Sequence, residues 1–133
     1  MMSDTQPLDR PALRLHEGQV PAFTVQDMTT YLHGAPCSSF GPTFSGDPPT
    51  IETLEFVGCE ELTGRLNLWI GLTDDAPVCY VVLRGPFVLR SISLPPGHPG
   101  GPAYSETVFE IYDASTGRLI VKGVGDGKPR PGY

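Results

Sequence analysis

Few side chains in this sequence have the type and spacing that catalysis requires. The three histidines, His16, His33 and His98, are far apart in the sequence, and nothing in their spacing indicates a metal site. His33 lies four residues before Cys37, a spacing that could pair a thiol nucleophile with a base. A histidine at the end of a helix is also favoured by the helix dipole, and a nearby loop cysteine then needs no catalytic role. We favour this structural interpretation.

The acidic and glycine-rich stretches are equally unspecific. Glu60-Glu61 and Asp74-Asp75 are adjacent in sequence, which is typical of a helix start and of a turn, whereas a hydrolytic carboxylate pair faces one substrate across a cleft. The stretch GVGDG lacks the Lys-Ser/Thr of a phosphate-binding loop. The sequence therefore predicts no catalytic residue, no metal ligand and no cofactor. Whether the chain is an enzyme stays open, and a non-enzymatic function is favoured.

The stretch VFEIYDASTGRLIVKG, residues 108–123, is the clearest local motif. Two runs of strand-forming residues flank a turn in which Asp113 can accept hydrogen bonds from backbone N–H groups and Gly117 can supply a positive φ. We predict that this turn is structural. The residues that remain open to an interaction or turn role are Asp113, Thr116, Gly117, His98 in the loop PPGHPGGP, and Trp69.

The elements that would position these residues can be read from local patterns. Thr24 is a good N-cap, Asp27 completes a capping-box pattern, and Gly34 can end a helix, so FTVQDMTTYLHG predicts a helix over residues 25–33. Strands are predicted at residues 50–57, 78–83, 107–112 and 118–122. Residues 60–72 fit either a helix or an alternating strand, and both alternatives stay open. These elements indicate an α+β fold in which one main helix packs on a small antiparallel β-sheet, with long Pro/Gly loops and flexible termini.

Length and composition indicate one small domain. The 133 residues include 16 Gly and 15 Pro, which concentrate in the loops and at both ends. We therefore expect a flexible N-terminal arm at residues 1–20, a single domain at residues 21–124 and a flexible C-terminal tail at residues 125–133.

The charge and hydropathy patterns bear on partners and compartment. The net charge is −6 and the nine Lys and Arg are scattered, so we expect no nucleic-acid binding, which needs a basic stripe. No apolar run approaches the ~20 residues of a membrane span. No signal peptide is visible. We expect a cytoplasmic protein if the chain is complete, and a secreted or cell-envelope protein if an export signal was removed.

The three cysteines form no CxxC pair, so neither a zinc ribbon nor a thioredoxin-type motif is indicated. Cys79 lies in VCYVVL and is expected to be buried. Cys37 and Cys59 flank a Pro/Gly loop and could form a disulfide in an oxidising compartment, which stays open.

The order of these elements resembles that of the PepSY domain, a small α+β module whose last hairpin reads strand, Asp-Ala-x-Thr-Gly, strand. The match covers about residues 23–124 and is closest at Asp113, Ala114, Thr116 and Gly117, followed by Leu119. The resemblance implies a helix packed on an antiparallel sheet. It also implies a role in inhibiting or chaperoning a secreted peptidase, or in binding at the cell envelope, and it supplies no catalytic residue.

Three functions remain open at this point. The first is a non-catalytic protein-interaction module that presents a sheet face or the Pro/Gly loops to a protein partner. The second is a small enzyme or ligand-binding protein that uses a pocket between helix and sheet. The third is a self-assembling structural subunit, a homo-oligomer, because open sheet edges invite strand exchange between copies. A deep pocket that holds His33, Cys37 or His98 beside a carboxylate would favour the second.

Overall fold

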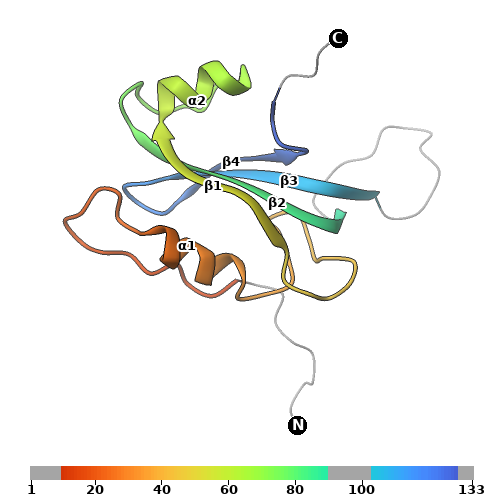
Figure 1. Cartoon of the computed structure of the whole chain (residues 1–133). Coiled ribbons are helices and arrows are strands. Elements are labelled where there is room, and N and C mark those ends of the chain that lie inside the picture. Colours follow the sequence, from red (N-terminus) through yellow and green to blue (C-terminus); the bar gives the residue numbers. More distant parts are fainter. Residues whose placement is uncertain (1–9, 90–102, 129–133) are drawn as a thin grey trace.

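One antiparallel sheet organises the molecule. The computed structural model, which describes residues 10–89 and 103–128, has four strands in the order β1-β2-β3-β4. They are β1 (Thr50–Gly58), β2 (Pro77–Leu89), β3 (Ala103–Asp113) and β4 (Leu119–Val124). Each strand pairs with its neighbour in sequence, so β1 and β4 form the two edges of the sheet (Figure 1).

The central strand β2 is buried on both faces, which explains why VCYVVL is apolar at every position. Three of these side chains point to each side of the sheet: Cys79, Val81 and Leu83 to one, and Val78, Tyr80 and Val82 to the other. The register with β3 shifts between Arg84 and Phe87, where Gly85-Pro86 interrupts the ladder.

Helix α1 (Val25–Leu32) begins where the capping pattern predicts it. The Thr24 hydroxyl accepts a hydrogen bond from the Asp27 N–H at 3.0 Å, and the Asp27 carboxylate accepts one from the Thr24 N–H at 2.9 Å. The capping box is therefore confirmed, and His33 is the C-cap of the helix.

Helix α2 (Cys59–Leu66) resolves the ambiguity at residues 60–72. The helical alternative is correct for the first part of that stretch, and the strand alternative is wrong. Asn67 ends the helix with a left-handed φ of 51°, and the alternation that follows belongs to an irregular segment. Its apolar side chains reach the core without strand pairing, since Ile70 is buried and Leu68 and Leu72 pack beside it.

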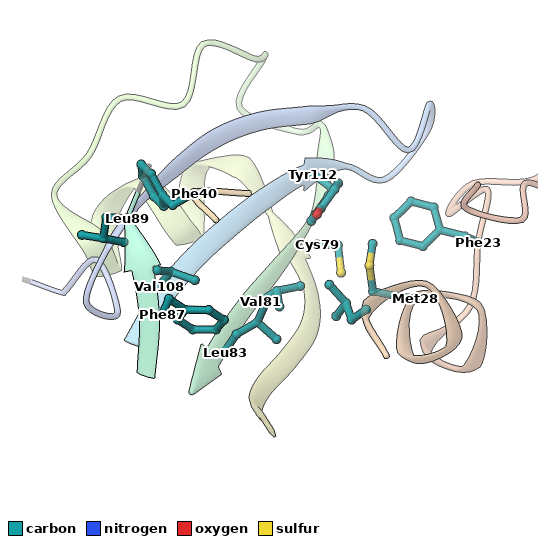
Figure 2. Packing of buried hydrophobic residues seen from close by; sticks show 11 residues of the cluster. Phe23, Met28, Phe40, Cys79, Val81, Leu83, Phe87, Leu89, Val108 and Tyr112 are labelled. Atoms are coloured by element: carbon teal, nitrogen blue, oxygen red, sulfur yellow. The ribbon is translucent and has the colours of Figure 1, made fainter. Parts of the chain in front are cut away.

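The two helices lie on opposite faces of the sheet, and each face has its own core (Figure 1). Figure 2 shows the α1-side core, in which Phe23 and Met28 meet side chains of β2 and β3. The buried members of this core are Phe23, Met28, Leu32, Phe40, Cys79, Val81, Leu83, Phe87, Leu89, Val108 and Tyr112. Those of the α2-side core are Cys59, Leu62, Leu66, Ile70, Val78, Tyr80, Val82, Phe109 and Ile111.

The expected α+β fold with one main helix packed on the sheet is wrong. Within the described residues the chain is mostly β, with two helices of eight residues each. An eight-residue helix rises only about 12 Å, so α1 covers only part of the sheet face. The rest is covered by the loop that carries Phe40 and by residues 10–22. The antiparallel sheet itself is present as expected.

Residues 10–22, called here the N-terminal segment, contain no helix or strand but contact the sheet. Leu13 packs against the α1-side core, and the Ala22 N–H donates to the carbonyl of Ala114 at 2.7 Å. At the other end of the chain, the Tyr80 hydroxyl donates to the carbonyl of Asp126. The division into an arm at 1–20, a domain at 21–124 and a tail at 125–133 stays a prediction, because residues 1–9 and 129–133 lie outside the described residues.

The expected absence of a membrane span can be tested for helices in the described ranges. Over residues 10–89 and 103–128, neither helix has the length and apolar character needed to cross a membrane.

Candidate functional site

The turn of the β3–β4 hairpin satisfies its own polar groups. The Asp113 carboxylate accepts hydrogen bonds from the Ser115 N–H at 2.8 Å and from the Ser115 hydroxyl at 2.6 Å. Thr116 accepts from the Arg118 N–H at 3.2 Å. Gly117 has a φ of 76°, and its N–H donates to the Asp113 carbonyl at 2.8 Å. Each predicted turn residue therefore has a local structural partner, and an interaction role for these residues stays a prediction.

The other two predicted interaction residues are not joined to this turn. Trp69 follows α2 and is 85% exposed. Among the described residues, no hydrogen bond or ring contact links Trp69 to the hairpin. His98 lies outside the described residues.

The site that the structure does assemble is a buried ion pair that sequence analysis missed. Arg10 places its two terminal nitrogens on the two carboxylate oxygens of Glu110, each at 2.8 Å. The Tyr112 hydroxyl accepts from Arg10 at 2.8 Å and donates to Glu110 at 2.6 Å. The second oxygen of Glu110 also accepts from the Ser39 N–H at 2.9 Å. The Arg10 guanidinium reaches the carbonyl of Cys37 at 3.4 Å, so three separate parts of the chain meet here.

Two tyrosine rings complete the surroundings of the guanidinium. The centre of the Arg10 guanidinium lies 5.4 Å from the ring centroid of Tyr31 on α1, a cation–π distance. The rings of Tyr31 and Tyr112 pack edge to face at 6.1 Å. The charged group therefore lies in a buried pocket with aromatic walls.

Burial and pairing act in opposite directions on the charges of this site. The Glu110 side chain is 0% exposed and that of Arg10 is 7% exposed. Burial alone would raise the pKa of Glu110, but the hydrogen bonds and charge of Arg10, with the Tyr112 hydroxyl and the Ser39 N–H, hold that pKa below its usual value. Burial likewise disfavours the charged form of Arg10 and alone would lower its pKa. The hydrogen bonds and charge of Glu110 outweigh burial and raise the pKa of Arg10. Both groups are therefore ionised at neutral pH.

The backbone and two glycines place the partners of this ion pair. Glu110 and Tyr112 are two residues apart on β3, so both point to the α1 side of the sheet, where Tyr112 belongs to the core. A Cβ atom at Gly34 would lie 2.3 Å from the Pro11 ring, so only glycine admits the N-terminal segment this close. A Cβ atom at Gly117 would lie 2.8 Å from Leu15, so the N-terminal segment also packs closely against the hairpin turn.

A second notable feature is a shallow surface hollow, named the aromatic surface, which is lined by the exposed aromatic side chains of Phe44 and Tyr104 and by the half-buried Pro86. Phe44 is 64% exposed and Tyr104 is 52% exposed, and their rings meet edge to face at 5.5 Å. A backbone hydrogen bond holds Phe44 beside Pro86, because the Phe44 N–H donates to the Pro86 carbonyl at 2.8 Å.

The thiol–imidazole pair suggested by the sequence is not assembled as a catalytic site. His33 lines an open groove between α1 and β1, together with Val25, Thr29, Pro48, Pro49, Thr50, Ile51 and Leu54. No carboxylate lines this groove in the described part of the chain. Cys37 is buried on the α1 side, where its carbonyl accepts from Arg10.

The cysteines occupy opposite faces of the sheet. Cys59 belongs to the α2-side core, so the sheet lies between it and Cys37, and a disulfide between the two does not fit this fold. Cys79 is buried as expected, and burial raises the pKa of its thiol to about 12. Across residues 10–89 and 103–128, no group of three or more His, Cys, Asp or Glu could hold a metal ion.

Comparison with known proteins finds no matching family model, no matching curated protein and no matching solved structure. The one sequence signal of the buried ion pair is Glu110 itself, a charged residue in a strand whose neighbours on both faces are apolar.

Proposed function

We propose that this chain is a non-catalytic protein-interaction module that binds an extended, proline-containing segment of a partner through the aromatic surface. The observation that carries the proposal is the pair Phe44 and Tyr104, two large aromatic rings exposed side by side around Pro86. Large exposed aromatic side chains that contact each other are typical of recognition surfaces rather than of solvated ones.

The lining of the aromatic surface favours an apolar, extended ligand. None of its three residues carries a charge. Aromatic-lined grooves bind proline-rich segments because the polyproline II conformation is already extended and stacks its rings on aromatic faces. Two backbone hydrogen bonds fix the loop that carries Phe44 to β2. The Phe44 N–H donates to the Pro86 carbonyl, and the Val88 N–H donates to the Pro42 carbonyl at 2.8 Å. A rigid receptor loses little entropy on binding.

The resemblance of the hairpin to the PepSY domain supports the finer part of the proposal, namely that the partner is a peptidase that the module inhibits or chaperones. Self-association through the open edges of β1 and β4 is the alternative that the sheet order favours.

A peptide selection tests the proposal directly. Random peptides displayed on phage would be selected on the full chain, and the affinity of the recovered peptides would be measured for Phe44→Ser, Tyr104→Ser and the control Trp69→Ser. Trp69 is a suitable control because it is an exposed aromatic residue outside the aromatic surface. We expect proline-containing peptides whose affinity falls at least tenfold, about 1.4 kcal/mol, in the first two variants and is unchanged in the third. Peptides that bind all three variants equally, or lose affinity only with Trp69→Ser, would refute this surface.

A further inference from the structure

We propose that the pocket around Glu110 is a binding site for a guanidinium group. Arg10 of the same chain fills this site, and an arginine from another source can occupy it when the N-terminal segment detaches. This inference rests on the buried ion pair and is independent of the aromatic surface.

The receptor half of the site is built without the N-terminal segment. Glu110 and Tyr112 are held by β3, while the Ser39 N–H and the Cys37 carbonyl come from the loop after α1. The Ser39 N–H and the Tyr112 hydroxyl each donate to one carboxylate oxygen, which fixes the orientation of Glu110. The pocket therefore keeps its shape by contacts that do not involve Arg10.

The geometry of the pocket favours a planar guanidinium group with two parallel donors over a compact ammonium group. Both oxygens of Glu110 accept from the terminal nitrogens of Arg10 at 2.8 Å, which is bidentate pairing. The ring of Tyr31 lies over the guanidinium, and delocalised guanidinium groups stack on rings more favourably than a strongly hydrated ammonium does. The Nε atom of Arg10 is buried and has no partner in the described part of the chain, so recognition uses the terminal nitrogens alone. A small guanidinium compound can make the same contacts.

Side chains, not backbone hydrogen bonds, attach residues 10–15. Among the described residues no backbone hydrogen bond ties residues 10–15 to the rest of the molecule, and the first such bond comes at Ala22, whose N–H donates to Ala114 in the β3–β4 turn. Leu13 is partly buried and Leu15 is 49% exposed. The guanidinium of Arg10 is therefore the main polar anchor of this part of the chain.

Chemical rescue tests the receptor. Arg10→Ala leaves Glu110 buried without its counter-ion, and ethylguanidinium should restore the pair. We expect the melting temperature of Arg10→Ala to rise with ethylguanidinium concentration until the site saturates. Ethylammonium should need at least ten times the concentration for the same rise. The wild-type protein, whose site is filled, and the double variant Arg10→Ala/Glu110→Gln, which lacks the carboxylate, should not respond.

The rescue remains decisive if Arg10→Ala does not fold alone. In that case ethylguanidinium should restore the near-ultraviolet circular dichroism of the folded protein, and ethylammonium should not. Equal responses to the two compounds, an equal response of the double variant, or no response to ethylguanidinium would each overturn the proposal.

A second variant tests displacement of the N-terminal segment without changing the receptor. A side chain at Gly34 would overlap Pro11, so Gly34→Val should push Arg10 out while Glu110 and Tyr112 stay in place. We expect ethylguanidinium, which has no counterpart of the Pro11 ring, to bind Gly34→Val at least tenfold more tightly than it binds the wild type. Ethylammonium should bind Gly34→Val at least tenfold less tightly than ethylguanidinium does.

A peptide distinguishes the source of the arginine in Arg10→Ala, where Gly34 still admits Pro11. Binding of the labelled peptide RPALRL, residues 10–15, to Arg10→Ala that is at least tenfold tighter than that of ethylguanidinium would assign the site to the N-terminal segment of a second copy of this chain. Similar affinities would assign it to any accessible arginine side chain. If ethylguanidinium binds the wild type and Gly34→Val equally, or if ethylammonium binds Gly34→Val as well as ethylguanidinium does, the proposed displacement is wrong.

Discussion

Replacing Glu110 with glutamine should be among the most damaging conservative substitutions in this protein. Glu110→Gln keeps the size of the side chain but removes its charge, so Arg10, only 7% exposed, keeps a charge that no carboxylate compensates. Removing one partner of a buried ion pair costs about 3–5 kcal/mol. The free energy of unfolding of a domain is about 5–15 kcal/mol. The variant should therefore lose at least about a fifth of its stability.

The double variant Arg10→Met/Glu110→Leu removes both charges. It therefore separates the net contribution of the ion pair to stability from the penalty of leaving one charge buried without its partner. Apolar side chains of similar volume remove both charges, and such replacements are often neutral or stabilising. We expect its free energy of unfolding, from urea melts at pH 7, to exceed that of Glu110→Gln by about 3 kcal/mol or more.

The surface pair Arg65–Glu55 provides a matched control. Its nitrogen and oxygen lie 3.0 Å apart, and its side chains are 38% and 40% exposed. Glu55→Gln should therefore cost no more than about 1 kcal/mol. A loss below about 1 kcal/mol for Glu110→Gln as well, or a double variant no more stable than the single one, would show that Arg10 does not occupy the pocket in solution.

Three further predictions concern α1 and the thiols. Thr24→Ala should lower the free energy of unfolding in urea melts by about 1 kcal/mol, because it removes the N-cap hydroxyl; no measurable loss would contradict the capping box. The backbone N–H of Thr24 and the nearby His16 side chain hold the pKa of Asp27 below its usual value. The stability that this carboxylate contributes is therefore complete above its unfolded pKa of about 3.9 and is lost as the pH falls through the folded value, so Asp27→Asn should weaken the dependence of the urea midpoint on pH below about 4. An unchanged acid profile in Asp27→Asn would contradict this role. Cys79 should react with a thiol reagent at pH 8 only as fast as the protein unfolds, since its pKa is about 12 and it is buried; rapid labelling of the folded protein would show that the α1-side core opens.

Much of the local structure could be predicted because it depends on neighbours in sequence. The capping box of α1 needs only Thr24 and Asp27, and the β3–β4 turn needs only Asp113 to Gly117, so the sequence carries both. The extent of the helices could not be read in the same way. The second helix begins at Cys59, directly after Gly58 ends β1. Because glycine has a low helix propensity, Gly64 within α2 left the sequence pattern ambiguous between helix and strand.

The candidate site could not be predicted because it depends on contacts far apart in the chain. Arg10 lies in a polar stretch without periodicity, which is also the composition of a disordered arm. Glu110 occupies an alternating position of β3, and only the covering loop decides whether that face is buried. The aromatic surface likewise requires the pairing of Phe44 with the bend at Pro86, which no local pattern encodes.

The separation of 100 residues between Arg10 and Glu110 has a consequence during translation. A ribosome that adds about 5–20 residues per second completes Glu110 roughly 5–20 s after Arg10. Late in that interval α1 and the paired strands β1 and β2 can form, since their residues precede Glu110, but the N-terminal segment still has no Glu110 carboxylate to hold it. A nascent chain that carries residues 10–89 should therefore be cut by a protease within the N-terminal segment, and the completed chain should resist cleavage there.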